Sequence, residues 1–182
     1  MIAADNELLR KVEIIRVVGY PDVIYIPRLL LSHRLALAKS HYISALLEGN
    51  FQADLLHGKN RLFLRDDAFG RNLLYETRPI MESIVGKNLK EQYSFVSYYR
   101  RDSELRRHVD KLECQFTVGI ILFDSQGDSD KRMYLSFGDV EKATDLAMFS
   151  GDAAVFCGVT TPHWRPPLRN DFLCTLLLHY KE

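Results

Sequence analysis

Two histidines and one aspartate have the residue types and the spacing of a metal site. His108 and Asp110 are separated by one residue, and in an extended segment the alternation of side chains places both on one face. His163 follows the apolar run AAVFCGV and the turn TTP, so we expect it at the end of a second strand. Two imidazole nitrogens and one carboxylate oxygen on one face of an octahedral ion leave the opposite positions open. The three residues are therefore predicted to bind a metal ion that also takes exchangeable ligands, as in non-haem iron oxygenases.

The same residues also have a simpler interpretation. The pattern H-x-D often occurs by chance, and a histidine on a half-buried strand commonly makes only hydrogen bonds. Spacing alone leaves both interpretations open. The remaining histidines show no comparable pattern, and we expect structural roles for them: His33, His41, His57 and His179.

The elements that would position the three residues differ between the two parts of the chain. Residues 1–92 contain two stretches with helical spacing of apolar residues, Pro27–Asn50 and Gly70–Leu89, and Pro79 should kink or divide the second. The runs FQADLL and RLFLRDD between them have the composition of short strands. Residues 93–182 contain five further strand-like runs: YSFVSYY, ECQFTVGIILF, RMYLSF, AAVFCGV and DFLCTLLLHY. Helices followed by closely spaced strands predict a mainly β (α+β) fold, an antiparallel sandwich or barrel with N-terminal supporting helices.

Length and composition predict one domain over residues 1–182. The chain has 182 residues, of which 47% are hydrophobic, enough to bury an ordinary core. Lys and Arg number 24 and so do Asp and Glu, so there is no overall positive field to attract nucleic acid or anionic lipid. The sequence shows neither a signal-peptide pattern nor an apolar run of about 20 residues, and we expect a cytoplasmic protein without a membrane partner. The three cysteines lie in apolar stretches and are expected to be reduced and buried: Cys114, Cys157 and Cys174.

Two segments resemble the prolyl-4-hydroxylase-like branch of the 2-oxoglutarate/Fe(II) dioxygenases. In YSFVSYYRRDSELRRHVD, from Tyr93 to Asp110, a tyrosine and a turn lead into the H-x-D pair, as they do in that family. In SGDAAVFCGVTTPHWRPPLRNDFLCTLLLHY, a G-D-A strand, a P-H-W-R turn and a final strand ending in L-H-Y are similar to the corresponding parts of small bacterial members. The resemblance covers roughly Tyr93 to Tyr180, about half the chain.

This resemblance implies a fold, a cofactor and a reaction. The fold would be a double-stranded β-helix, also called a jelly roll or cupin-like fold, with the metal site in residues 93–182. His108, Asp110 and His163 would hold Fe(II), and Tyr99 would line the pocket of the cosubstrate, 2-oxoglutarate, and hydrogen-bond one of its carboxylates. With O2, the enzyme would hydroxylate an aliphatic C–H bond of an amino acid, a peptide side chain or a small metabolite, releasing succinate and CO2.

The chain departs from the family at the residue that pairs with the distal carboxylate of 2-oxoglutarate. The family usually supplies an Arg or Lys from the last strand, but here that strand has no basic residue before Lys181. The nearest candidates are Arg165 and Arg169, and Arg165 is favoured because it belongs to the H-W-R turn. A guanidinium suits the role because it binds a carboxylate through two parallel hydrogen bonds. Trp164 is a candidate wall of the substrate pocket, with packing under the following proline turn as the alternative.

Two other functions are compatible with these residues. A cupin-like binding or regulatory module without catalysis would account for the missing arginine of the last strand. A metal enzyme that uses no 2-oxoglutarate, such as a ring-cleaving dioxygenase, would use the same three ligands. The expected partner in the oxygenase interpretation is a small-molecule or peptide substrate, and no nucleic-acid partner is expected.

Overall fold

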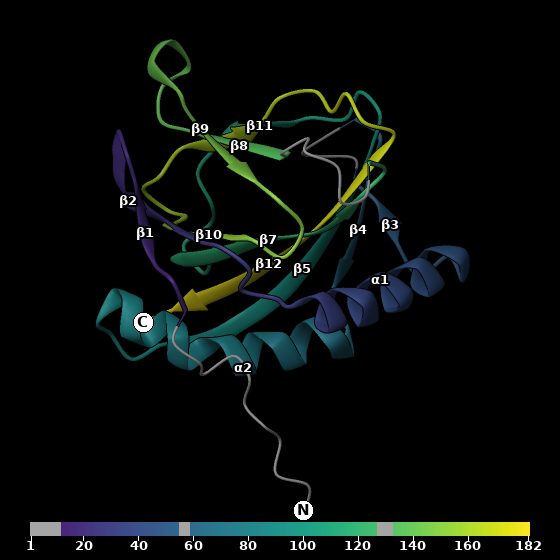
Figure 1. Ribbon diagram of the computed structural model, residues 1–182, viewed down its shortest axis with the longest axis horizontal. Helices are drawn as coiled ribbons and strands as arrows, with labels where there is room; N and C mark the ends of the chain where they lie inside the picture. Colours follow the sequence, from purple (N-terminus) through teal and green to yellow (C-terminus); the bar gives the residue numbers. More distant parts are fainter. Residues whose placement is uncertain (1–11, 55–58, 127–132) are drawn as a thin grey trace, which may run out of the picture.

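The computed structural model describes residues 12–54, 59–126 and 133–182, which form two antiparallel sheets and two long helices (Figure 1). Along the chain the elements are β1 (Ile15–Val17), β2 (Tyr20–Ile26), α1 (Ser32–Leu47), β3 (Gln52–Ala53), β4 (Arg61–Arg65), α2 (Ala68–Val85), β5 (Lys90–Arg100), β6 (Leu105–His108), β7 (Phe116–Asp124), β8 (Met133–Phe137), a short 3-10 helix (Val140–Lys142), β9 (Thr144–Met148), β10 (Ala153–Cys157), β11 (His163–Arg165) and β12 (Phe172–Lys181). The predicted mainly β fold with supporting helices is confirmed.

The two sheets face each other, and the helices cover one of them from outside. The larger sheet has the strand order β1-β2-β10-β7-β12-β5-β4-β3, and the smaller sheet has the order β6-β11-β8-β9. Both helices lie against the face of the larger sheet that points away from the smaller one (Figure 1). This arrangement is a jelly roll whose interior lies between the sheets.

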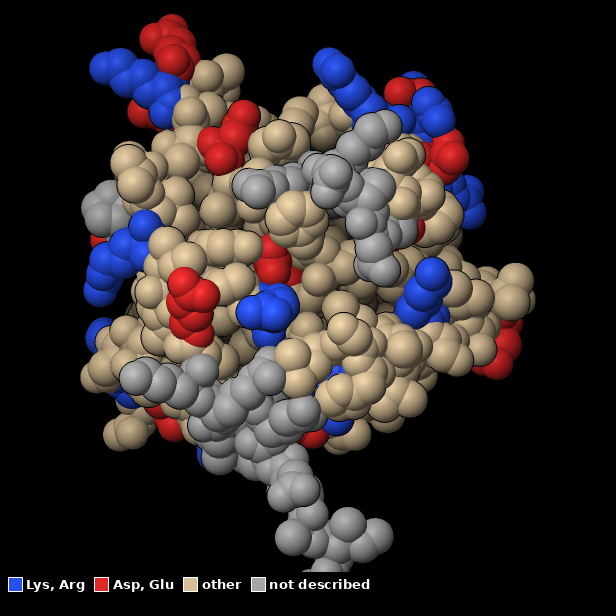
Figure 2. Space-filling view, viewed as in Figure 1, with Lys and Arg blue, Asp and Glu red and all other residues tan. Residues whose placement is uncertain are grey.

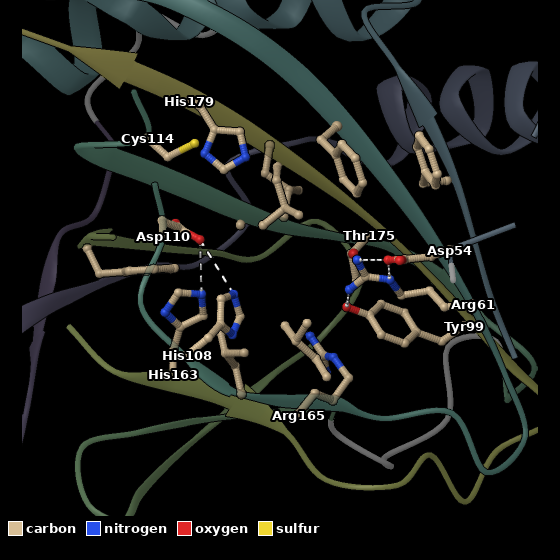
Figure 3. Close-up of a pocket in the computed structure, with 18 of the residues that line it drawn as sticks. Asp54, Arg61, Tyr99, His108, Asp110, Cys114, His163, Arg165, Thr175 and His179 are labelled. Atoms are coloured by element: carbon tan, nitrogen blue, oxygen red, sulfur yellow. Dashed lines mark hydrogen bonds and ion pairs between the residues drawn. The ribbon is translucent and has the colours of Figure 1, made fainter. Parts of the chain in front are cut away.

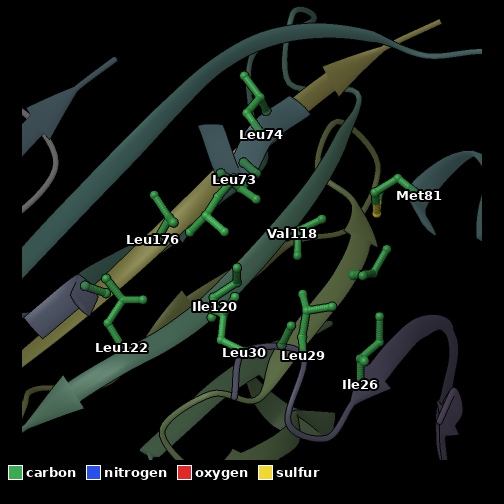
Figure 4. Close-up of a cluster of buried hydrophobic side chains, with 14 of the residues drawn as sticks. Ile26, Leu29, Leu30, Leu73, Leu74, Met81, Val118, Ile120, Leu122 and Leu176 are labelled. Atoms are coloured by element: carbon green, nitrogen blue, oxygen red, sulfur yellow. The ribbon is translucent and has the colours of Figure 1, made fainter. Parts of the chain in front are cut away.

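The last strand shows how one sequence serves both faces of the larger sheet. Side chains alternate along β12. Thr175, Leu177 and His179 point into the space between the sheets, where they line a cavity. The residues between them on β12 point to the other face and pack against the helices in the main core: Cys174, Leu176, Leu178 and Tyr180. The same core contains buried leucines of α2 and buried aliphatic residues of β7 (Figure 4): Leu73, Leu74, Val118, Ile120 and Leu122. The apolar run that predicted a strand therefore belongs to a strand that is covered on both sides.

The two predicted helices form, with changes at their ends. α1 begins at Ser32, because Arg28 has a left-handed backbone (φ 51°) and a turn separates Pro27 from the helix. α2 ends at Val85, where Gly86 adopts φ 70° as a left-handed cap. Pro79 does not divide α2, since it lies on the exposed side, where water can hydrate the carbonyl that loses its partner.

Several strands differ from the sequence prediction. β1, β2 and β9 were not predicted, and β2 contains Pro21 and Asp22, two residue types that are uncommon in strands. Of the run FQADLL only β3 is a strand, and its two leucines lie outside the described residues, as does Arg132 of the run RMYLSF. No helix in the described part of the chain is long and apolar enough to cross a membrane.

Candidate functional site

The histidines of the predicted triad are paired by the register of two strands. His108 ends β6 and lies directly opposite His163, the first residue of β11. Their rings lie 4.4 Å apart between centroids. Alternation along one strand predicted that Asp110 shares a strand with His108. Instead, Asp110 lies in the loop that follows β6. His163 does not end the strand AAVFCGV, because β10 stops at Cys157 and His163 opens a short strand of its own.

The three side chains converge on one point. The Asp110 Oδ1 atom lies 3.5 Å from His108 Nε2 and 3.7 Å from His163 Nε2 (Figure 3). All three candidate ligand atoms lie within 4.8 Å of one another. The set of two imidazoles and one carboxylate matches the facial arrangement of non-haem iron sites.

Hydrogen bonds to the backbone orient both histidines. His108 Nδ1 lies 2.8 Å from the carbonyl oxygen of Arg106, and His163 Nδ1 lies 2.9 Å from that of Thr161. Because a carbonyl only accepts, each Nδ1 carries the proton and each Nε2 presents its lone pair toward Asp110. Metal-binding histidines are commonly held in this way by a partner on the other ring nitrogen. The donors present therefore fit a divalent metal ion.

The second oxygen of Asp110 is held by a different set of contacts. The Thr117 hydroxyl donates to Asp110 Oδ2 at 2.9 Å, and the Asp110 amide donates to the Gly158 carbonyl, also at 2.9 Å. Thr117 Oγ1 is also 3.1 Å from His179 Nδ1. Since the single Thr117 proton goes to Asp110, His179 donates from Nδ1 to Thr117. Oδ2 of the carboxylate is thus anchored, while Oδ1 is directed toward the two histidines.

The pKa values of the two histidines of the triad shift in opposite directions. Burial acts to lower the pKa of His108, but its contacts with Asp110 and with the Arg106 carbonyl outweigh burial and raise it. Burial lowers the pKa of His163, which is almost completely enclosed. Burial acts to raise the pKa of Asp110, but the His108 contact and the nearby His163 hold it below its usual value. The metal-free site therefore contains an ionised carboxylate that attracts a cation.

The triad lines a cavity of about 320 Å3 that is also lined by two buried arginines, one on each sheet. Arg61 of β4 forms an ion pair with Asp54, and its Nη1 donates to the Tyr99 hydroxyl at 3.4 Å (Figure 3). Arg165 of β11 donates to the carbonyl of Tyr134 at 2.6 Å, and its guanidinium carbon lies 5.5 Å from the centroid of the Tyr99 ring. This end of the cavity therefore has two guanidiniums and one carboxylate, that of Asp54, which leaves an excess positive charge.

Arg165 also has an unused donor. Its Nε is buried and has no hydrogen-bond partner among the described residues. A buried unpaired donor is costly, and a charged one more so. A carboxylate entering the cavity would supply the missing acceptor, so the residues at this end fit the distal group of 2-oxoglutarate.

The structure separates the other sequence candidates. Tyr99 and Arg165 line the cavity, whereas Arg169 is exposed in the loop before β12 and does not. Trp164 does not line it either, because neighbours on a strand face opposite ways and both His163 and Arg165 point inward. Cys114 is buried as expected, but its Sγ contacts the Tyr93 hydroxyl at 2.9 Å and it lines the cavity.

Sequence reasoning missed most residues of the cavity, including Arg61, Asp54 and His179. Arg61 and Asp54 lie before Tyr93, in the part of the chain without a motif, and only the pairing of β4 with β5 brings Arg61 opposite Tyr99. His179 was assigned a structural role, yet it contacts the residue that anchors Asp110. The alternation of Thr175, Leu177 and His179 along the last strand is the signal that could have identified it.

Charge over the rest of the molecule is mixed. Figure 2 shows acidic and basic side chains interspersed on the face it presents, in keeping with the zero net charge of the chain. The net charge therefore provides no overall attraction for an anion.

Comparison with known proteins identifies the fold. No protein-family model matches the chain, and no curated protein matches it in sequence. Among solved structures, a prolyl-4-hydroxylase from Pseudomonas putida superposes with a TM-score of 0.72 and 12% sequence identity, over 88% of this chain and 92% of that one. This chain has the fold of the 2-oxoglutarate-dependent oxygenases.

Other members with this fold show the range of molecules they bind. HygX from Streptomyces hygroscopicus, solved with nickel and 2-oxoglutarate bound, has a TM-score of 0.68 and 13% identity, over 87% of this chain and 82% of that one. A prolyl hydroxylase from Trichoplax adhaerens, solved with a peptide fragment of hypoxia inducible factor, has a TM-score of 0.67 and 15% identity, over 87% of this chain and 83% of that one. The oxygenase fold predicted from the two sequence segments is confirmed.

Proposed function

We propose that this protein is an Fe(II)- and 2-oxoglutarate-dependent oxygenase that hydroxylates an aliphatic C–H bond of an amino acid, a peptide side chain or a small metabolite. The observation that carries this proposal is the convergence of His108, Asp110 and His163 on the wall of a cavity that also holds two buried arginines. A metal site and an anion site in one cavity are what a reaction with an anionic, metal-chelating cosubstrate requires. A cupin-like module without catalysis would not need the anion site.

The residues of the chain would divide the work by position. His108, Asp110 and His163 would hold the iron, with the Thr117 hydroxyl fixing the second oxygen of Asp110. Iron, when bound, supplies the redox chemistry that couples decarboxylation of 2-oxoglutarate to oxidation of the substrate. The lining would limit the water around the reacting groups, because most residues that line the cavity are apolar or paired.

The cosubstrate would bind with its distal carboxylate at the arginine end. Arg165 would supply the fork of parallel N–H donors, and the Tyr99 hydroxyl would add a further donor. Asp54 fixes the Arg61 guanidinium, so that Arg61 contributes positive charge without moving. Arg61, on β4, and Arg165, on β11, would thus take over the role of the basic residue missing from β12.

We also propose that residues 1–182 form a single domain. Supporting this, α1 and α2 share one hydrophobic core with β5, β7 and β12, and β4 contributes to the same cavity as β11. The N-terminal part of the chain would then contribute to the site and not only support it.

A spectroscopic experiment tests the function. Anaerobic addition of Fe(II) and 2-oxoglutarate should produce a weak visible charge-transfer band, because the cosubstrate chelates the iron. His108→Ala and Asp110→Ala should abolish the band by removing a ligand, whereas His41→Ala, on α1 outside the cavity, should retain it. Absence of the band in the intact protein would contradict the use of 2-oxoglutarate, and absence of bound iron would favour the non-catalytic module.

A further inference from the structure

A second cation lies on the same inner face of β4 as Arg61. Alternate residues of this strand point into the cavity, and the three that line it are Arg61, Phe63 and Arg65. Arg61 and Arg65 are four residues apart, which is roughly 13 Å along a strand. A five-carbon dicarboxylate with its other end at the metal cannot reach both. Arg65 is therefore available to a different ligand.

The two arginines differ in burial and in partners. The Arg61 side chain is 5% exposed and is paired with Asp54, whereas the Arg65 side chain is 50% exposed. Arg65 lies 3.8 Å from Asp66, a carboxylate that also has Arg71 at 3.8 Å. Exposed ion pairs of this length contribute little free energy. The Arg65 guanidinium consequently marks the open end of the cavity, as Arg61 marks the closed end.

Contacts around Arg65 hold its charge over the cavity. Its guanidinium carbon lies 3.8 Å from the centroid of the Tyr93 ring, a cation–π distance. Tyr93 lines the cavity and pairs in register with His179 of β12. Lys111 lines the cavity next to Asp110 and is exposed, which adds a second cation at this end.

The wall between the two arginines is apolar and flat. The rings of Phe63 and Phe95 stack with centroids 5.1 Å apart and planes 9° from parallel. Leu177 lies opposite Phe95 on the neighbouring strand. A cavity of about 320 Å3 is near the lower end of the usual range for ligand sites, roughly 300–1,000 Å3. The space beyond the cosubstrate thus suits a small, mostly apolar molecule.

The charges that line the cavity leave the open end positive. The two carboxylates that line the cavity both have partners: Asp54 pairs with Arg61, and Asp110 contacts the two histidines of the triad. At the closed end, Arg61 and Arg165 would face the cosubstrate. Arg65 and Lys111 have no carboxylate among the residues that line the cavity.

We propose that the substrate is a small organic carboxylate with an apolar body, whose carboxylate binds Arg65 and Lys111 and whose body packs on Phe63 and Phe95. This inference rests on the proposed function and names the substrate class of the same site. The carboxylate would hold the far end of the molecule, and the apolar body would extend toward the triad.

Calorimetric titration under anaerobic conditions tests the inference. The protein is first saturated with Fe(II) and 2-oxoglutarate, so that the arginine pair at the closed end is occupied. 3-Phenylpropionate is then compared with 3-phenylpropanamide, which has the same shape without the charge. We expect the carboxylate to bind at least roughly tenfold more tightly, as expected for a charge-assisted hydrogen bond. Higher salt should reduce this difference, because the site is partly open to solvent.

Variants locate the effect within the cavity. Arg65→Gln should weaken the binding of 3-phenylpropionate roughly tenfold, and Lys111→Gln should weaken it by a smaller factor. Arg71→Gln is the matched control, because Arg71 is similarly exposed and contacts the same Asp66 but does not line the cavity. Lys181→Gln is the matched control for Lys111→Gln, because Lys181 is also exposed but does not line the cavity.

The outcome separates this inference from the proposed function. If the charge-transfer band forms but carboxylate and amide bind equally, the substrate class is wrong and the oxygenase proposal stands. If Arg65→Gln and Arg71→Gln weaken binding equally, the carboxylate is not bound by Arg65. If the band itself does not form, the proposed function fails first.

Discussion

At the scale of single residues, the site depends on the donors and acceptors that each side chain has left over. The backbone carbonyls of Arg106 and Thr161 fix the protonated nitrogens of the two histidines, which leaves their Nε2 atoms for a metal. Arg165 retains an unpaired buried Nε, which leaves it for a carboxylate. Arg169 has the same side chain, but its exposure lets water satisfy every donor. Burial, rather than residue type, distinguishes the two arginines.

This difference makes a testable prediction. Arg165→Gln should raise the Kd for 2-oxoglutarate at least tenfold, because a charge-assisted hydrogen bond contributes about 1.5–3 kcal/mol. Arg169→Gln should leave that Kd unchanged. Calorimetric titration of the Fe(II)-loaded protein without oxygen measures both values, and iron binding by itself checks that the Arg165 variant is folded. Equal effects of the two substitutions would argue against Arg165 as the anchor.

At the scale of elements, the register of two strands and one close backbone approach position the three candidate metal ligands. The antiparallel pairing of β6 with β11 sets His108 against His163, and a loop returns Asp110 to them. That loop packs against Gly158, just past the end of β10. A Cβ atom at Gly158 would collide with the Asp110 carboxylate and would lie 2.6 Å from the Cys114 carbonyl oxygen. Only glycine allows Asp110 to approach the backbone so closely.

Gly158→Ala is therefore expected to displace Asp110 and to weaken metal binding by tenfold or more, as loss of the groups that orient a ligand does. Gly119→Ala, within the same larger sheet, is the control, because its Cβ would meet only Leu177 at an ordinary 3.7 Å. Titration with Ni(II) measures the affinity, and circular dichroism confirms the fold. Unchanged affinity in the Gly158 variant would show that Asp110 does not depend on this contact.

At the scale of the whole molecule, the cavity is formed by strands from both parts of the chain. β4 supplies Arg61 and Arg65, β5 supplies Tyr93, Phe95 and Tyr99, and β12 supplies Thr175, Leu177 and His179. His179 lies deep in this shared interior, 5% exposed, and burial lowers its pKa to about 4. Its protonation state is therefore coupled to the folding of the entire chain.

Stability of the metal-free protein should fall as the pH is lowered from about 6.5 to about 4. In this range the unfolded chain binds a proton at residue 179, whereas the folded protein does not, so the contribution lost is about 3 kcal/mol. The lowered pKa of His163 acts in the same direction, and the raised pKa of His108 opposes it. Urea unfolding at several pH values, followed by Trp164 fluorescence, measures the change.

His179→Gln should reduce the slope of stability against pH, because the group that differs between the folded and unfolded states is removed. An NMR titration provides an independent check in the unsubstituted protein, where the His179 ring signals should remain those of a neutral imidazole until the pH approaches 4. A His179 ring that titrates near its ordinary pKa would contradict the prediction.

The general architecture and the three candidate metal ligands could be predicted from the sequence alone. His108, Asp110 and His163 stand out because their residue types and spacing have a chemical meaning, and the strand-like runs after Tyr93 indicate a β-rich core. The sequence also shows that the last strand lacks a basic residue before Lys181, but it does not show which residues take over that role. Trp164 was a reasonable candidate only because it adjoins His163 in the chain, and alternation along β11 turns it away.

The tertiary structure was needed to show which residues share the cavity with these three candidate ligands. Arg61 lies 47 residues (108 − 61) before His108 in the chain, and no local pattern connects the two. They share a cavity because β4 pairs with β5 in the larger sheet, while β6 pairs with β11 in the smaller sheet that faces it. Sheet pairing joins residues by register and not by proximity in the chain. For that reason the candidate metal ligands could be predicted from local spacing, whereas the residues proposed to bind the two anions could not.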